Sequence, residues 1–149
     1  MKQSVSPILI EAVIPSNNGA AIFLKESEKT FVIYVDKDNG DAMKMALEGQ
    51  IYERPFTHQL MLNMLDGLGA ELERVVINDL ERGTYFARII LSMENEIARK
   101  IVELDARPSD AIVLALLCEK PLYASQNVLN KAEDMTAIYK KIINPKSEF

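Results

Sequence analysis

The chain has 149 residues, of which 48% are hydrophobic and 26% are charged, so it is long enough to bury one core in a single domain. Its formal net charge of −5 argues against tight, sequence-independent binding of nucleic acid, and a nucleic-acid site would need a local basic patch. The lone cysteine, Cys118, excludes an internal disulfide and a Cys-rich zinc site. The chain has neither an apolar run of membrane-spanning length nor the pattern of a secretory signal, so we expect a cytoplasmic protein that does not enter a membrane.

The first third of the chain begins with a predicted β-meander. Residues 8–15, 20–26 and 30–36 are short runs rich in apolar and β-branched side chains. The turn-forming letters SNNG and the polar stretch KESEK separate them. Three consecutive antiparallel strands are therefore expected here.

Two helices are expected after the meander. Residues 38–49 predict the first, because Asp38 or Asn39 can cap its N-terminus and Gly49 can end it. Residues 57–68 predict the second, which follows the short segment QIYERPF. Both helices precede a second region with strand composition.

The middle of the chain predicts three more antiparallel strands and a buried helix. Residues 72–79, 84–92 and 97–104 have strand composition, and the turn signals LERGT and MENE separate them. The helix expected over residues 109–119 has no polar face, so it should lie centrally against the sheet. Residues 121–125 read as one further short strand.

The end of the chain predicts one amphipathic helix, capped by Ser125 and stopped by Asn144 and Pro145. Its apolar side chains recur every three or four residues, at Val128, Ala132, Met135, Tyr139 and Ile142. The chain therefore combines a largely antiparallel sheet with helices packed against it. We divide it into a domain over residues 1–125 and a C-terminal helix over residues 126–149, packed on that domain or on a dimer partner.

The junction between the sixth strand and the buried helix concentrates charge. Asp105 and Arg107 stand where the strand ends, and Ser109 and Asp110 open the helix. A helix N-terminus offers unpaired N–H groups and a partial positive charge, so with an adjacent arginine it can receive a phosphate or carboxylate. The same residues could instead cap the helix and pair with one another.

A second polar cluster, ERPFTH, lies at the entry to the predicted helix over residues 57–68. Thr57 can cap this helix, which places His58 in the first turn, after Arg54. His58 is the only histidine, which excludes any mechanism that needs two. The positive end of a helix disfavours a charged imidazole and suits a neutral general base or a hydrogen-bond donor. A purely structural histidine is the alternative.

Several common catalytic motifs are missing. The sequence contains no GxSxG elbow and no glycine-rich phosphate loop, which argues against serine hydrolases and common nucleotide-binding folds. The remaining candidates for a catalytic site lie near the starts of two predicted helices: Arg54, His58, Asp105, Arg107 and Asp110. They include a base, cations for a scissile phosphate and oxygen ligands for Mg2+ or Mn2+, as phosphodiester hydrolysis requires. A network of Arg and Asp side chains with a purely structural role would give the same sequence pattern.

An ordered set of motifs also resembles a known family. RPFTH, LGAELERVVI, GTYFA, LDARPSDAIVLAL and a PLY strand, within residues 8–125, resemble the bifunctional nuclease domain family. The resemblance implies an α+β fold, a homodimer, and the activity toward RNA and DNA ascribed to some plant members. The family's motif positions here are Arg54, Pro55, Thr57, His58, Gly83, Thr84, Asp105, Arg107, Pro108, Ser109 and Asp110.

These observations lead to one hypothesis with two alternatives. The first is a homodimeric nuclease, a hydrolase of RNA or DNA that uses no organic cofactor. Its catalytic residues would be His58, Asp105 and Asp110. Its phosphate-binding residues would be Arg54, Thr57, Arg107 and Ser109, and Asp105 and Asp110 would hold Mg2+ or Mn2+. The alternatives are a non-catalytic interaction or regulatory domain, and a module that binds an anion or metabolite.

Overall fold

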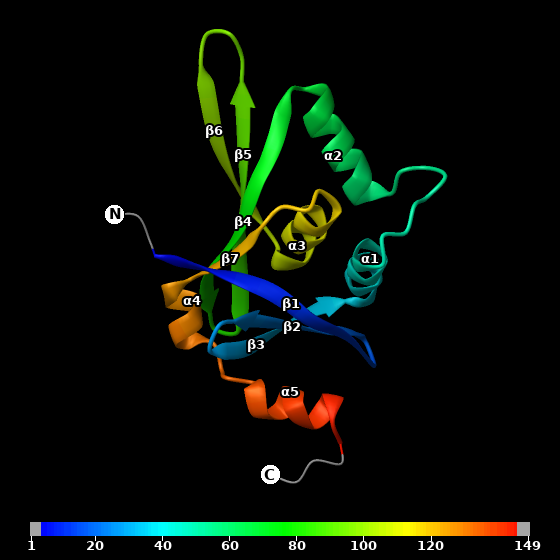
Figure 1. Ribbon diagram of the computed structural model, residues 1–149, viewed down its shortest axis with the longest axis vertical. Coiled ribbons are helices and arrows are strands. Elements are labelled where there is room, and N and C mark those ends of the chain that lie inside the picture. The colour runs from blue at the N-terminus through cyan, green and yellow to red at the C-terminus, as the bar shows by residue number, and fades with distance from the viewer. Residues whose placement is uncertain (1–3, 146–149) are drawn as a thin grey trace.

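The computed structural model describes residues 4–145 and has an α+β fold, with five helices around one seven-stranded sheet (Figure 1). The strands are β1 (Val5–Ser16), β2 (Gly19–Glu26), β3 (Lys29–Asp36), β4 (Ala70–Glu81), β5 (Thr84–Glu94), β6 (Arg99–Ala106) and β7 (Leu122–Ser125). The helices are α1 (Lys37–Leu47), α2 (Thr57–Gly67), α3 (Pro108–Leu117), α4 (Gln126–Lys131) and α5 (Thr136–Ile143). The predicted fold class is confirmed.

The sheet consists of two antiparallel meanders joined by the short strand β7. The strand order is β3-β2-β1-β7-β4-β5-β6, so both predicted meanders are confirmed. Leu122 of β7 lies opposite Ile8 of β1 in an antiparallel pair and opposite Val75 of β4 in a parallel pair. Four residues of β7 thus make the two halves of the chain one sheet.

Helix α3 occupies the centre of the molecule, as its uniformly apolar sequence predicted. Ala111, Ile112 and Ala115 are fully buried. The helix contacts β4 and β5 of the sheet and also both α1 and α2. Its N-terminus, which carries the charged junction, is therefore fixed on three sides by packed elements.

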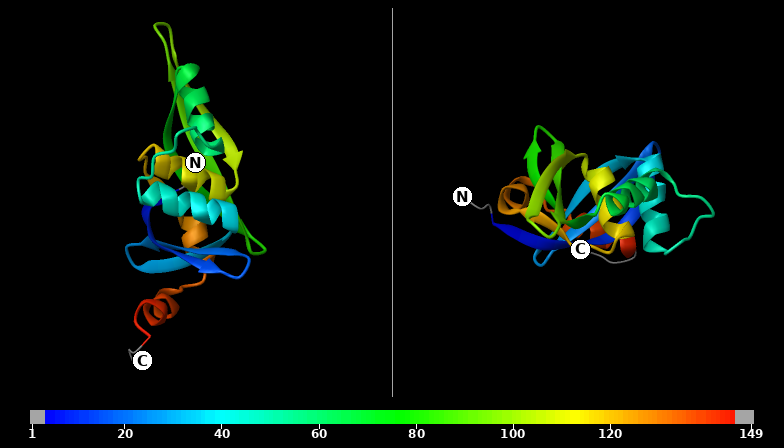
Figure 2. Two further views of the ribbon diagram at one scale, coloured as in Figure 1. Left: turned by 90° about the vertical axis from the view of Figure 1, so that its right-hand side faces the viewer. Right: turned by 90° about the horizontal axis from the view of Figure 1, so that it is seen from above.

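The outer strands and helices give the molecule an elongated shape. Figure 2 shows β5, β6 and α2 at one end of the long axis and α5 at the other. Strand β6 is the last strand of the sheet, and α2 runs beside β4. The ends of α2 and β6 that carry the polar motifs point back toward α3 (Figure 1).

Two helices have N-caps that precede the predicted ones. Asp36, the last residue of β3, caps α1 by accepting from the Asn39 backbone N–H at 3.4 Å, instead of Asp38 or Asn39. The strand therefore runs into the helix without a loop. At α2 the N-cap is Phe56 and Thr57 is the first helical residue, because the Gln59 side chain accepts from the Phe56 N–H at 2.6 Å.

The predicted C-terminal helix is two helices, α4 and α5. Ser125 caps α4 as expected, accepting from the Val128 N–H at 3.2 Å. Ala132 is extended, and α5 begins at Thr136 with Met135 as its N-cap and no side-chain cap; just before it, Asp134 accepts from the Thr136 N–H at 3.0 Å. A local side-chain hydrogen bond of this kind competes with continuous helix, and the apolar spacing does not reveal it.

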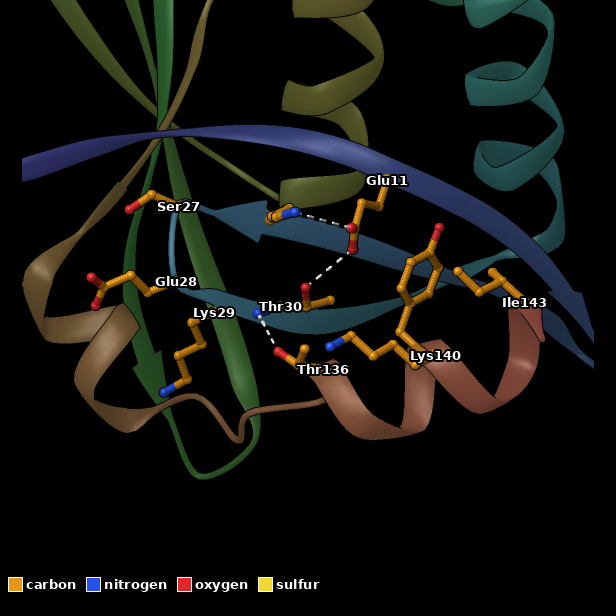
Figure 3. A pocket seen from close by; sticks show the side chains of 10 residues that line it. Glu11, Ser27, Glu28, Lys29, Thr30, Thr136, Lys140 and Ile143 are labelled. Atoms are coloured by element: carbon orange, nitrogen blue, oxygen red, sulfur yellow. Dashed lines mark hydrogen bonds and ion pairs between the residues drawn. The ribbon is translucent and has the colours of Figure 1, made fainter. Parts of the chain in front are cut away.

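Helix α5 packs on its own chain, against β2 and β3. The Met135 N–H donates to the Thr30 carbonyl at 2.6 Å, and the rings of Tyr139 and Phe23 are 5.2 Å apart. Figure 3 shows the polar hollow of about 260 Å³ beside this contact, where Glu11 accepts from the Thr30 hydroxyl at 3.1 Å. Among the residues that line it, the Thr30 N–H donates to the Thr136 hydroxyl at 3.3 Å, which joins α5 to β3.

Candidate active site

The two polar motifs meet in one hydrogen-bonded chain of three side chains. His58 Nε2 lies 3.0 Å from Asp110 Oδ1, and Arg107 Nε donates to Asp110 Oδ2 at 2.9 Å. His58 comes from the first turn of α2, Asp110 from the first turn of α3, and Arg107 is the N-cap of α3. Residues 52 positions apart in sequence therefore converge, as the first hypothesis required.

The environment of Asp110 favours its ionised form. Partial burial opposes ionisation, but hydrogen bonds from Arg107 and His58 outweigh it and lower the pKa of the Asp110 carboxyl. The hydrogen bond to Asp110 in turn raises the pKa of Arg107. The carboxylate also lies in the first turn of α3, where the helix dipole stabilises negative charge.

The ionised carboxylate determines the tautomer of a neutral His58. Asp110 can only accept, so Nε2 must carry the proton and donate to it. The lone pair of a neutral imidazole is then on Nδ1, and Nδ1 has no hydrogen-bond partner among residues 4–145. The His58 side chain is 15% exposed and borders a surface hollow. This geometry suits a general base held by a carboxylate.

Two hollows flank the hydrogen-bonded side chains of His58, Asp110 and Arg107. The first, about 420 Å³, lies on the His58 side and is lined by Asp38, Phe56, Thr57 and Leu60 among others. The second, about 390 Å³, lies on the Arg107 side, between the start of α3, the end of β3 and the β4–β5 turn. Both fall in the size range of ligand pockets.

The remaining predicted site residues divide into two groups. Thr57 borders the first hollow, and the buried Ser109 borders the second. Arg54 is exposed and makes no hydrogen bond or ion pair within residues 4–145. Asp105 is exposed on β6, where its register partner on β5 is Arg88. The structure thus brings neither Arg54 nor Asp105 into contact with the His58–Asp110–Arg107 chain.

The expected divalent metal does not fit these residues. Both carboxylate oxygens of Asp110 already accept hydrogen bonds, from His58 and from the cationic Arg107. A metal ion at Asp110 would have to displace one of them and lie beside a guanidinium. Asp105 does not complete a site, since no three His, Cys, Asp or Glu side chains within residues 4–145 form a metal-binding group.

Several side chains that border the hollows were not predicted from the sequence. They are Tyr34, Asp36, Asp38, Asn39, Phe56 and Tyr85. The segment Asp36–Asn39 is the start of α1, and it borders both hollows. Tyr34 is exposed within the apolar run of β3, and nothing in the sequence places it near Arg107.

Comparison with known proteins identifies the family. The sequence model of the bifunctional nuclease domain matches residues 22–136, which include all three joined side chains. The chain belongs to the bifunctional nuclease domain family. Membership supports a nuclease-related function. No helix within residues 4–145 has the length and hydrophobicity to cross a membrane.

The individual relatives align with different shares of this chain. An uncharacterised protein of Mycobacterium tuberculosis is 29% identical over 117 residues, which are 77% of this chain and 67% of that protein. Bifunctional nuclease 1 of Arabidopsis thaliana is 34% identical over 73 residues, 49% of this chain but 22% of the plant protein. Bifunctional nuclease 2 of Oryza sativa is 32% identical over 75 residues, 50% of this chain and 23% of its own length. The plant proteins therefore extend far beyond the shared domain.

The lowered pKa of Asp110 predicts that acid lowers the free energy of unfolding. Its stabilising effect is complete above the unfolded pKa, about 3.9, and is lost as the pH falls through the lower folded pKa. We expect Asp110→Asn to cost about 1–3 kcal/mol of unfolding free energy at pH 7 and to flatten its decline below about pH 5. Urea unfolding from pH 3 to 7 measures this. Asp66→Asn on α2 is the control, and equal acid slopes for wild type and Asp110→Asn would contradict the assignment.

Proposed function

We propose that this protein hydrolyses phosphodiester bonds in RNA or DNA at the hydrogen-bonded side chains of His58, Asp110 and Arg107. The observation that carries the proposal is the Asp110 carboxylate, which holds a histidine at 3.0 Å and an arginine at 2.9 Å between two open hollows. A base and a phosphate-binding cation are thereby fixed beside one another. Family membership independently supports a nuclease-related function.

Arg107 and the start of α3 supply the phosphate site in this proposal. Arg107 uses only Nε on Asp110, and its side chain is 69% exposed, so both Nη groups are available to a phosphate. The N–H groups of Ser109 and Asp110 lie in the first turn of α3, where the helix provides them with no acceptor. Pro108 has no N–H to satisfy. Guanidinium and helix N-terminus together can stabilise the charge that develops on the scissile phosphate.

His58 supplies the base. Nδ1 removes a proton from a water molecule in the first hollow, and the water oxygen attacks phosphorus. The phosphorus–oxygen ester bond breaks, the leaving oxygen takes a proton from solvent, and His58 later releases its own proton. The products are a phosphomonoester and an alcohol. Ionised Asp110 stabilises the imidazolium that forms and keeps the ring oriented.

A cleavage assay tests the proposal and its metal requirement. The purified chain is incubated with end-labelled single-stranded RNA or DNA in Mg2+, Mn2+ or EDTA. We expect cleavage that persists in EDTA, because Asp110 is already occupied by Arg107 and His58. Arg107→Ala should lower kcat/KM roughly 10- to 100-fold. Arg88→Ala, which removes another ion-paired surface arginine, is the control. Binding without cleavage by the wild type would instead favour an anion-binding module.

Helix α2 supports a homodimeric form of this nuclease. Three of its apolar side chains and that of its C-cap, Leu68, form one stripe at helical spacing and are 41–71% exposed; the three are Leu60, Met61 and Met64. A second copy can cover this stripe through a two-fold contact. We expect light scattering to give twice the chain mass for wild type and the single chain mass for Met64→Glu. Asn63→Glu, an adjacent exposed position, should stay dimeric, and a monomeric wild type would contradict the proposal.

A further inference from the structure

The hollow on the Arg107 side is bordered by an exposed tyrosine that has no part in proton transfer by His58. Tyr34 borders this hollow and is 71% exposed. It projects from β3, which is the first strand of the sheet and lies at its edge (Figure 1). Arg107 lines the same hollow, so an aromatic face and a guanidinium are both open to one ligand there.

The β4–β5 turn borders the same hollow as Tyr34. Arg82 and Gly83 form this two-residue turn with φ angles of 51° and 80°, so Thr84 pairs with Glu81. Gly83, Thr84 and Tyr85 line the hollow together with the start of α3. The Tyr85 ring packs on Phe31 of β3 with centroids 6.0 Å apart, which fixes the turn against the strand that carries Tyr34.

The charges in the hollow also suit a nucleotide. Arg107 is the cation at its border; its Nη groups make no hydrogen bond or ion pair within residues 4–145, although its charge also interacts with that of Asp36. Asp36 also borders the hollow, but its carboxylate accepts from the Asn39 side-chain amide at 2.7 Å and caps α1. The negative charge of Asp36 is therefore stabilised by its own helix. A ligand with an anionic group and a flat ring matches this arrangement.

We propose that this hollow binds an unpaired nucleobase, which stacks on Tyr34 while its phosphate contacts Arg107. This rests on the proposed function and narrows its substrate class to single strands, because bases in a duplex are stacked on one another and cannot enter. Stacking on an aromatic ring tolerates any base, since each has a π-face. The subsite therefore provides strand selectivity without sequence selectivity.

A fluorescence titration tests the subsite without requiring cleavage. The chain has no tryptophan, so Tyr34→Trp introduces a single tryptophan, which can be excited apart from the tyrosines and can still stack. The full chain is titrated with a 12-nucleotide oligothymidylate and with a duplex of equal length. We expect saturable quenching by the single strand and none by the duplex. Leu9→Trp, at a position 73% exposed on β1, should show no saturable quenching.

Affinity measurements complete the test. Tyr34→Ala should raise the Kd for the oligothymidylate roughly 5- to 150-fold, while Tyr34→Phe should retain wild-type affinity. Equal affinity of wild type and Tyr34→Ala, or quenching by the duplex as well, would overturn the subsite. Loss of cleavage in His58→Ala with no effect of Tyr34→Ala would overturn the subsite alone. Tyr34-dependent binding by a wild type that cleaves nothing would overturn only the hydrolysis.

Discussion

His58→Ala is expected to lower the rate of phosphodiester cleavage by about 10²- to 10⁴-fold, the usual contribution of a general base. His58 is the only imidazole in the chain, and it borders the first hollow while Asp110 holds Nε2 at 3.0 Å. Nδ1 has no hydrogen-bond partner within residues 4–145, and no second imidazole is present to replace it. Initial rates on a labelled single-stranded RNA measure the effect.

Two controls separate catalysis by His58 from a structural role. Asn63→Ala on the same helix should retain wild-type activity, since Asn63 is exposed and outside the first hollow. Added imidazole should partly restore the rate of His58→Ala, because a free base can enter the space left by the ring. A His58→Ala variant as active as wild type would show that the base lies elsewhere.

Ile112→Ala is expected to lower the free energy of unfolding by about 2–5 kcal/mol. Ile112 is fully buried in the middle of α3, the helix that contacts β4, β5, α1 and α2. Truncation leaves a cavity that so many packed neighbours cannot fill by moving. The midpoint of urea unfolding, followed by circular dichroism, measures the loss.

The matched control for Ile112 is Ile97, which is 94% exposed between β5 and β6. Ile97→Ala should change stability by no more than about 0.5 kcal/mol. A loss below about 1 kcal/mol in Ile112→Ala would contradict the central position of α3. Because α3 also carries Asp110, that result would weaken the case for a preorganised site.

The strands and the central helix could be predicted because their signals are local. Apolar, β-branched composition and turn residues predicted both meanders, and the apolar run of α3 predicted its burial. The position of β7 could not be predicted in this way, because a four-residue strand pairs with partners far away in sequence. The break between α4 and α5 includes a local hydrogen bond from the Thr136 N–H to Asp134, inside an otherwise continuous apolar pattern.

The site was predictable in its chemistry but only partly in its geometry. The two charged motifs indicated His58, Arg107 and Asp110, and the fold joins all three. Asp105 belongs to the same motif, yet it ends on exposed β6, because a strand residue and a helix residue five positions later take unrelated directions. The hollow bordered by Tyr34 depends on β3, the β4–β5 turn and α3 coming together, which no local pattern encodes.

A double-mutant cycle on cleavage of single-stranded RNA tests most directly whether His58 and Asp110 form one catalytic unit. Rates are measured for wild type, His58→Ala, Asp110→Asn and the double variant, all at a temperature where each is folded. If Asp110 acts through His58, the double variant will be no slower than His58→Ala alone. Independent, multiplicative losses, or unchanged rates in both single variants, would contradict the account.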